Sequence, residues 1–189
     1  MKNPELIVFT GPMFSSKTTR LLLAAEKSKR QGRKVMAFKA TLDGRYHDSN
    51  ITSHMGWSLA AQSVEIGHQI WNHVERNFDY KNNAPESCVI IVDEAFMIEG
   101  AAETIIRLYQ RGHTVFVSSI QLSSDGKSFE EIEKLLPYAT KVEVCSAACA
   151  VCGLDAFYSA RTSSVSDIIH VGGDQSYEPR CWQHFDKLR

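Results

Sequence analysis

Short runs of apolar and β-branched residues recur along the first two-thirds of the chain. They occupy Leu6–Thr10, Lys34–Phe38, Cys88–Val92 and Thr114–Ser118. Nearly continuous runs of this length, without polar alternation, are typical of strands that are covered on both faces of a sheet. The pattern therefore predicts a buried sheet.

Helical patterns separate these strands. They cover Thr18–Gln31 and Ala101–Arg111, and Gly32 and Gly112 stand where each helix is expected to end. A further helix is predicted over Phe129–Leu135. Because the order strand, helix, glycine, strand occurs twice, we expect an α/β fold with a mainly parallel sheet.

The character of the sequence changes after about Cys145. Candidate metal ligands, Ser- and Gly-rich turns and a short predicted strand at Asp167–Val171 follow. We therefore expect a domain boundary there, with an α/β domain over residues 1–144 and a small lobe over 145–189. Within the first domain, the polar segment Asp43–Trp57 is expected to form a long loop.

Composition and charge exclude several classes of protein. Hydrophobic residues make up 43% and charged residues 23% of the chain, the balance of a soluble globular protein with a sizeable core. A net charge of −1 supplies no global field for nucleic acid or an anionic membrane. No apolar run approaches the roughly 20 residues of a membrane helix, and Leu6–Phe9 is too short for a signal-peptide core. We expect a cytoplasmic protein without a membrane or nucleic-acid partner.

A candidate phosphate-binding loop follows the first predicted strand and opens the first predicted helix. Its sequence is Gly11-Pro12-Met13-Phe14-Ser15-Ser16-Lys17-Thr18. This matches G-x-x-x-x-G-K-[ST] except that Ser16 occupies the second glycine position. In such a loop, backbone N–H groups bind phosphates, the lysine contacts the β- and γ-phosphates, and the threonine hydroxyl binds Mg²⁺. The loop predicts binding of ATP with Mg²⁺; the alternative is a serine-rich turn without a ligand.

Two carboxylates, Asp93 and Glu94, directly follow the apolar run Cys88–Val92. In phosphate-loop proteins an Asp at such a strand end holds the Mg²⁺ shell, and an adjacent acid is able to act as a base. Because successive strand residues point in opposite directions, we expect Asp93 to face the metal and Glu94 the acceptor. The alternative is a pair of solvated helix caps.

Cysteine and histidine residues near the end of the chain form two short pairs. The pairs are Cys149-x-x-Cys152 and Cys181-x-x-His184. Three thiolates and one imidazole would give Zn²⁺ a closed, structural tetrahedron. Cys145 or His170 remains open as a replacement for His184. The alternative is a set of reduced cysteines and a surface histidine.

Together, these motifs resemble the thymidine kinase family, which combines a P-loop α/β domain with a zinc-bearing lobe. The likeness spans nearly the whole chain. It also includes Lys39–Tyr46, Ser53-His54, Asp93-Glu94-Ala95 and Val171–Pro179. The implied fold is an α/β, P-loop (RecA-like), mainly parallel sheet flanked by helices, with a small C-terminal zinc-ribbon and lid domain.

The resemblance implies transfer of the γ-phosphoryl group of ATP to the 5′-hydroxyl of thymidine or a related deoxyuridine nucleoside. It assigns Glu94 as the general base and Arg45 as a residue that neutralises charge during transfer. Asp43 takes a position near the metal and the phosphates. The resemblance also implies a homo-oligomer, often a tetramer.

The positions that face the nucleoside depart from the family pattern. The family has Gln after the D-E-A triplet, where this chain has Phe96, and an aromatic residue where it has Ser124. The resemblance places the nucleoside among Met13, Phe96, Ser124, Phe129, Ser159, Ile168 and Tyr177. Because serine cannot stack on a base, we expect an altered base preference that admits a modified deoxyuridine.

Two other functions fit parts of the pattern. The first is a regulatory homologue that binds a nucleotide but is catalytically weak or inactive. Ser16 and the altered base positions fit this function, but the retained Lys17, Asp93 and Glu94 argue against it. An ATPase that acts on nucleic acid would use the basic run over residues 27–34. Charge of this kind on a helix is usually solvated, so this function ranks last.

Overall fold

The central sheet has six strands among the residues that the structure describes, and each neighbouring pair is parallel. The structure is a computed structural model that describes residues 3–41, 50–79, 88–162 and 176–188. The strand order is β5-β2-β6-β7-β1-β8. These strands are β1 (Leu6–Thr10), β2 (Lys34–Ala40), β5 (Gln62–Val64), β6 (Cys88–Asp93), β7 (Thr114–Ser119) and β8 (Lys141–Val144). The α/β fold class with a mainly parallel sheet is confirmed.

The four apolar runs of the sequence are the four central strands. The two edge strands, β5 and β8, were not predicted. Their sequences, Gln-Ser-Val and Lys-Val-Glu-Val, are short and partly polar because an edge strand is less covered than a central one. A search for continuous apolar runs therefore finds the middle of the sheet and misses its edges.

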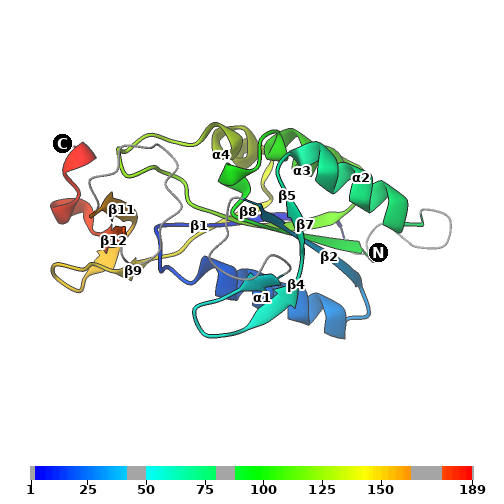
Figure 1. Ribbon diagram of the computed structural model, residues 1–189, viewed down its shortest axis with the longest axis horizontal. Helices are drawn as coiled ribbons and strands as arrows, with labels where there is room; N and C mark the ends of the chain where they lie inside the picture. The colour runs from blue at the N-terminus through cyan, green and yellow to red at the C-terminus, as the bar shows by residue number, and fades with distance from the viewer. Residues whose placement is uncertain (1–2, 42–49, 80–87, 163–175, 189) are drawn as a thin grey trace.

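Helices cover both faces of the sheet (Figure 1). Helix α1 (Lys17–Arg30) lies on one face. Helices α2 (Gly67–Asn77), α3 (Ala101–Gln110) and α4 (Glu130–Leu135) lie on the other. The three predicted helices are found within one residue of their expected bounds. None of the helices in the described ranges is long and apolar enough to cross a membrane.

Helix α2 was not predicted, because it begins at a glycine. The Gly67 N–H donates to the Glu99 carbonyl at 2.8 Å, and a Cβ on Gly67 would lie only 2.2 Å from the Gly100 carbonyl oxygen. Glycine is therefore required for the start of α2 to approach the start of α3 this closely. A residue that usually disfavours a helix is here a packing requirement.

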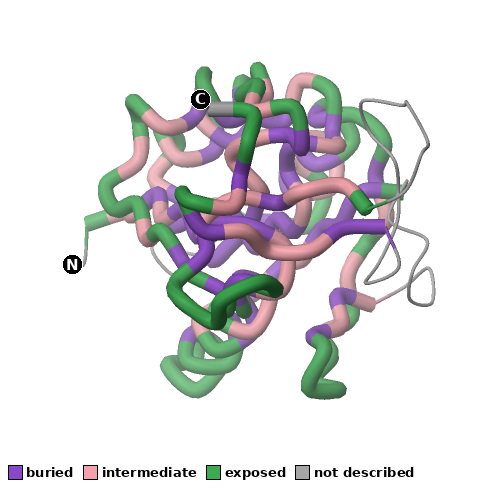
Figure 2. Tube along the Cα trace, turned by 90° about the vertical axis from the view of Figure 1, so that its left-hand side faces the viewer, coloured by how far each residue is buried: buried purple, intermediate pink, exposed green. Residues whose placement is uncertain are grey.

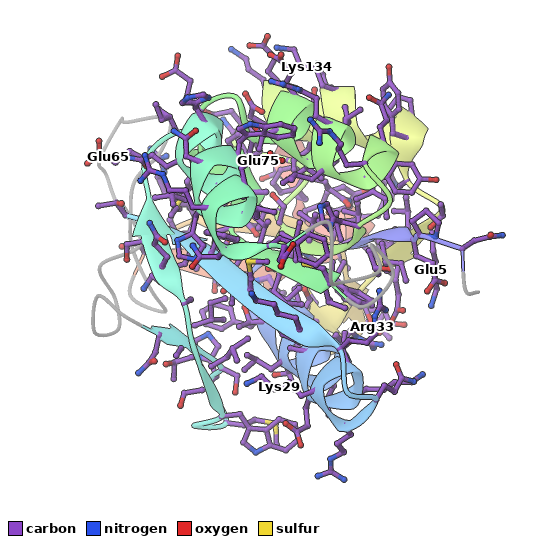
Figure 3. All side chains as sticks on the ribbon, turned by 90° about the vertical axis from the view of Figure 1, so that its right-hand side faces the viewer. Glu5, Lys29, Arg33, Glu65, Glu75 and Lys134 are labelled. Carbon is purple, nitrogen blue, oxygen red and sulfur yellow. The ribbon has the colours of Figure 1, made fainter. Side chains whose placement is uncertain are left out.

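Side chains of the sheet alternate between two apolar layers. On one face, Ile90 and Val117 pack in the core with Ile105, while on the other Ile91 packs with Leu21. Figure 2 shows the buried stretches gathered in the middle of the molecule. Figure 3 shows charged residues on the outer surfaces of both helical layers. Burying an Ile or Leu side chain contributes about 1.5–3 kcal/mol, so these two layers are the main source of stability.

The predicted loop over Asp43–Trp57 is partly wrong. Residues 42–49 lie outside the described residues, but Asn50–Thr52 forms strand β3, which pairs antiparallel with β4 (Ser58–Ala60). The Ile51 side chain is buried in the layer that includes α1. One buried isoleucine in a polar segment was too weak a pattern to predict this hairpin.

The segment after β8 contains two small antiparallel ribbons at one end of the molecule (Figure 1). They are β9 (Ala147–Ala148) with β10 (Asp155–Ala156), and β11 (Tyr158–Arg161) with β12 (Tyr177–Arg180). The predicted strand at Asp167–Val171 lies outside the described residues. Short 3₁₀ helices are η2 (Ala95–Met97), η3 (Leu136–Tyr138), η4 (Trp182–His184) and η5 (Asp186–Leu188).

A buried histidine lies just before β7. The His113 side chain is 0% exposed, and its ring meets the edge of Phe78 with centroids 4.9 Å apart. Burial lowers the pKa of His113 to about 4, although the charge of Glu75 opposes the shift. The imidazole is therefore neutral at pH 7.

We predict that acidification from pH 7.5 to 5 destabilises the protein through His113. An unfolded histidine binds a proton below about pH 6.5, whereas the folded one stays neutral down to about pH 4. The contribution of neutral His113 to the free energy of unfolding is therefore complete above pH 6.5 and is lost as the pH falls toward 4. At pH 5 the expected loss in the free energy of unfolding is about 2 kcal/mol.

Urea unfolding at the two pH values checks this expectation. His113→Leu should lose less stability than the wild type on acidification, while His68→Leu, at an exposed position, should lose as much as the wild type. An equal loss in His113→Leu and the wild type contradicts the assignment.

Candidate active site and metal site

The loop between β1 and α1 has the strained backbone of a phosphate-binding turn. Phe14 and Ser16 have positive φ values of 63° and 61°, which non-glycine residues adopt rarely. Ser16 occupies the position where the motif has glycine, so its left-handed backbone explains why glycine is the usual residue there. Residues held in such conformations cost about 1–3 kcal/mol and are concentrated at functional sites.

Gly11 begins this loop and cannot be replaced. Its φ is 142°, and a Cβ at this position would lie 2.2 Å from the Cys145 carbonyl oxygen. The Cys145 N–H in turn donates to the Thr10 carbonyl at 2.7 Å. The first residue of the loop is therefore pressed against the segment that leaves β8.

The ammonium group of Lys17 lies inside the turn of the loop. Lys17 Nζ donates to the Pro12 carbonyl at 2.6 Å and lies 3.4 Å from Ser15 Oγ, and the side chain is buried. Ser15 Oγ also donates to the Pro12 carbonyl at 2.8 Å. A cation is thus held where the loop's concave side would receive an anion.

Thr18 and Asp93 meet at the carboxyl ends of the strands. Thr18 Oγ1 donates to Asp93 Oδ1 at 3.3 Å. Ser118 Oγ, from the end of β7, donates to the same carboxylate oxygen. Ser118 was missed by the sequence analysis, and its only signal was a polar residue at the end of an apolar strand. The hydroxyl and carboxylate oxygens brought together here are ligands that Mg²⁺ accepts.

Glu94 turns away from Asp93. Its backbone is left-handed, with φ 53° and ψ 47°, between β6 and η2. Glu94 lines a pocket together with residues 13–19 of the loop and α1 and with Ser53 and His54 of the β3–β4 turn. The two adjacent carboxylates therefore lie in different surroundings.

The β3–β4 turn contributes the far wall of this pocket. Ser53 Oγ accepts a hydrogen bond from the Trp57 N–H at 3.2 Å, which closes the turn. The His54 ring lies against Phe14, with centroids 5.4 Å apart. Lys39, a buried residue opposite Asp93 in the β2–β6 register, lies 3.5 Å from the Asn50 carbonyl through its Nζ. The hairpin thus packs directly on the loop.

Two pairs of the residues expected to surround the nucleoside are in contact, and a fifth, Tyr177, lies in the ribbon that carries Ser159. The Met13 N–H donates to Ser159 Oγ at 2.9 Å, which joins the loop to β11. Phe96 packs on Phe129 with ring centroids 4.6 Å apart. Tyr177 pairs with Arg161 across the β11–β12 ribbon, and the guanidinium donates to its hydroxyl at 3.3 Å.

Ser124 lines an open cavity together with Arg161, Arg180 and Lys187. Arg161 is the residue that contacts Tyr177, so this cavity adjoins the β11–β12 ribbon. Asp43, Arg45 and Ile168 lie outside the described residues, as does His170.

The four expected metal ligands form one cluster. Their ligand atoms all lie within 4.8 Å of one another. The sulfur atoms of Cys152 and Cys181 are 3.7 Å apart, and His184 Nδ1 lies 3.2 Å from Cys181 Sγ and 3.7 Å from Cys149 Sγ. A tetrahedron with metal–sulfur bonds of about 2.3 Å has edges of about 3.8 Å, so this cluster fits Zn²⁺.

Backbone hydrogen bonds favour the thiolate form of Cys149, whereas the pKa of Cys152 is raised. Desolvation raises the pKa of Cys149, but N–H groups of Cys181, Val151 and Cys152 outweigh it and lower the pKa to about 5. Cys145 does not belong to the cluster, because its side chain is buried in the core layer beside α1. Among the described residues, His184 is therefore the fourth candidate ligand.

The metal site replaces a hydrophobic core. Among the described residues of this segment, the buried apolar cluster comprises Cys149, Ala156 and Cys181. Tyr158 and Phe185 add one stacked pair with centroids 4.9 Å apart. So small a core depends on the free energy of metal binding to stay folded.

We predict that Cys181→Ser removes bound zinc and unfolds the ribbons after β8. Metal content by plasma emission spectrometry should fall from about one zinc per chain to near zero, and protease sensitivity after residue 145 should rise. Cys145→Ala, which tests the alternative ligand, should keep its zinc. Retention of zinc by Cys181→Ser, or its loss from Cys145→Ala, contradicts the ligand set.

The chain matches a model of a known protein family. A family model described as thymidine kinase matches residues 4–185, which is nearly the whole chain. The match includes the phosphate-binding loop, the Asp93–Glu94 strand end and the metal cluster. The chain belongs to the thymidine kinase family, whose members are kinases that bind ATP.

Proposed function

We propose that this protein is an ATP-dependent thymidine kinase. It transfers the γ-phosphoryl group of ATP to the 5′-hydroxyl of thymidine, or of a related deoxyuridine nucleoside, and gives the 5′-monophosphate. The observation that carries the proposal is one pocket that holds a buried lysine of a phosphate-binding loop and a separate carboxylate, Glu94. The phosphoryl donor and the acceptor hydroxyl would thus each meet a separate residue, Lys17 and Glu94, in the same pocket.

The donor side uses the loop from Gly11 to Thr18. Its N–H groups and the Lys17 ammonium bind the β- and γ-phosphates, and Lys17 exchanges its contact with the Pro12 carbonyl for them. Thr18 and Asp93 hold Mg²⁺, and Ser118 orients the Asp93 carboxylate. Held by Thr18 and Asp93, Mg²⁺ would supply positive charge against the negative charge that develops during transfer.

The acceptor side uses Glu94 as the general base that takes the proton of the 5′-hydroxyl. Its separation from Asp93 supports this role, because Asp93 is already engaged by two hydroxyl groups. Arg45 neutralises charge on the transferred group, and Asp43 lies near the metal; both assignments come from the family pattern.

The nucleoside lies among Met13, Phe96, Ser124, Phe129, Ser159, Ile168 and Tyr177. Phe96, two residues after the proposed general base Glu94, packs on Phe129 in the core, and Phe129 is the more exposed ring of the pair. Stacking of a nucleobase on an aromatic ring contributes about 1–3 kcal/mol. Ser124 offers no stacking surface, which favours an altered base preference. A panel of deoxynucleosides with radiolabelled ATP tests this part, and strict thymidine preference would refute it.

We further propose a cytoplasmic enzyme of nucleotide salvage for DNA synthesis. It is a homo-oligomer, a tetramer by family resemblance, and it uses neither a membrane nor nucleic acid. Residues 1–144 form the nucleotide-binding domain, and 145–189 form the zinc lobe and substrate lid. The second candidate function is a weak or inactive nucleotide-binding regulator, which the strained Ser16 backbone favours.

We predict that Glu94→Gln lowers kcat for thymidine phosphorylation by about 10²–10⁴, because a positioned base contributes about this factor. ATP affinity should stay within about twofold, because Gln keeps the shape of the side chain. Transfer of labelled phosphate from ATP to thymidine measures kcat, and equilibrium titration with an ATP analogue measures affinity.

Glu99→Gln is the matched control. Its side chain is exposed and outside the pocket, so its kcat should equal that of the wild type. Normal turnover by Glu94→Gln overturns the base assignment. A wild-type protein that binds ATP and forms no product supports the regulator instead.

A further inference from the structure

The turn that follows β7 places Ser124 at a cavity. Ser123 Oγ accepts hydrogen bonds from the N–H groups of Asp125 at 3.3 Å and Lys127 at 3.2 Å. The Ser123 N–H donates to the Lys127 carbonyl at 2.7 Å. Ser124 is 9% exposed and lines a cavity of about 410 Å³, together with residues of the segment after β8. Ser123 therefore holds the turn, and the Ser124 side chain is placed to meet a ligand in the cavity.

The wall of this cavity is rich in hydrogen-bond donors. Arg161 and Arg180 line it from the β11–β12 ribbon, and both residues are half-buried. Asp125, Asp186 and Lys187 also line it, and all three are exposed at the surface. A guanidinium group has five N–H donors and no acceptor, and its strongest hydrogen bonds are to carboxylates and phosphates. The half-buried wall therefore favours a ligand group with acceptor oxygens.

Neighbouring residues of the ribbon orient both guanidinium groups. Arg161 Nη2 donates to the Tyr177 hydroxyl at 3.3 Å, and Arg180 Nη2 donates to the Glu178 carboxylate. A guanidinium group held in this way loses less conformational entropy when it binds an acceptor. The two arginines are thus preorganised toward a ligand in the cavity.

The cavity adjoins the place where the nucleobase is expected. Ser159 and Arg161 lie two positions apart in β11, and Tyr177 stands opposite Arg161 in the register. The three side chains are therefore on one face of the ribbon. Ser159 contacts the phosphate-binding loop, because its Oγ accepts a hydrogen bond from the Met13 N–H at 2.9 Å. The ribbon face that carries the expected nucleoside residues thus continues, through Arg161, into the cavity.

We propose that this cavity receives the substituent at C5 of the uracil ring, and that the substrate is a deoxyuridine whose C5 substituent carries acceptor oxygens, as a carboxylate does. C5 is the position at which thymidine differs from other deoxyuridines. An aromatic residue at position 124, as in the family pattern, would fill the space beside the turn, whereas Ser124 leaves it open. The inference rests on the proposed nucleoside kinase activity and names the substrate class of that site.

Two nucleosides of nearly the same shape test the proposal in the full-length, zinc-loaded protein. One is 5-carboxyvinyl-deoxyuridine, and the other has an isopropyl group in place of the carboxylate. We expect kcat/KM for the carboxylate analogue to exceed that for the apolar analogue about tenfold or more, because hydrogen bonds to charged groups are strong. Isothermal titration without ATP should give a similar ratio of dissociation constants.

Substitution at the turn separates the cavity from the rest of the nucleoside site. Ser124→Phe restores the aromatic residue of the family pattern and should bring the ratio between the two analogues down to about one. Titration with thymidine shows whether the nucleoside site of this variant is folded. Lys127→Ala, at an exposed position of the same turn and outside the cavity lining, is the matched control and should keep the wild-type ratio.

The outcomes distinguish this inference from the proposed activity. Equal or better use of the apolar analogue by the wild type overturns the cavity assignment, and so does an unchanged ratio in Ser124→Phe. Phosphorylation of thymidine without preference between the analogues refutes the cavity assignment alone. Selective binding of the carboxylate analogue without phosphorylation of any nucleoside supports the cavity and contradicts the kinase activity. A protein that binds no nucleoside overturns both.

Discussion

The hydrogen bonds of Asp93 are the constraint on which the candidate site depends. One carboxylate at the end of β6 is held by Thr18 from the start of α1 and by Ser118 from the end of β7. Parallel strands bring these three segments to one edge, because all their carboxyl ends lie on the same side of the sheet. With Asp93 engaged there, the left-handed turn at the next residue points Glu94 into the pocket of the phosphate-binding loop. The backbone therefore places the carboxylates of Asp93 and Glu94 in different surroundings.

The segment after β8, which carries the candidate metal ligands, contacts the same loop closely. Gly11 lies against the Cys145 carbonyl, and the Met13 N–H donates to Ser159 of β11. The ribbon that carries Ser159 ends at Cys181, one of the four candidate metal ligands. A metal ion held by this cluster would therefore fix a segment that touches the residues expected to bind phosphate and nucleoside. A lobe with almost no apolar core would not hold these contacts without the metal.

The sequence predicted the parts of the protein where one physical demand dominates. Central strands such as β6 must be apolar along their whole length, and metal ligands must have fixed spacing, so both were found. Helix α2 was missed because Gly67 is required by a close approach that no local pattern reveals. The β3–β4 hairpin was missed because it depends on a single buried residue, Ile51. Ser118 was missed because its role arises only when neighbouring strands meet.

A structure of the protein with thymidine and a non-hydrolysable ATP analogue tests the central claim most directly. We expect Lys17 Nζ within hydrogen-bond distance of the β- and γ-phosphate oxygens and the Glu94 carboxylate within hydrogen-bond distance of the 5′-hydroxyl. A triphosphate bound away from Lys17, or a sugar hydroxyl out of reach of Glu94, would contradict the account.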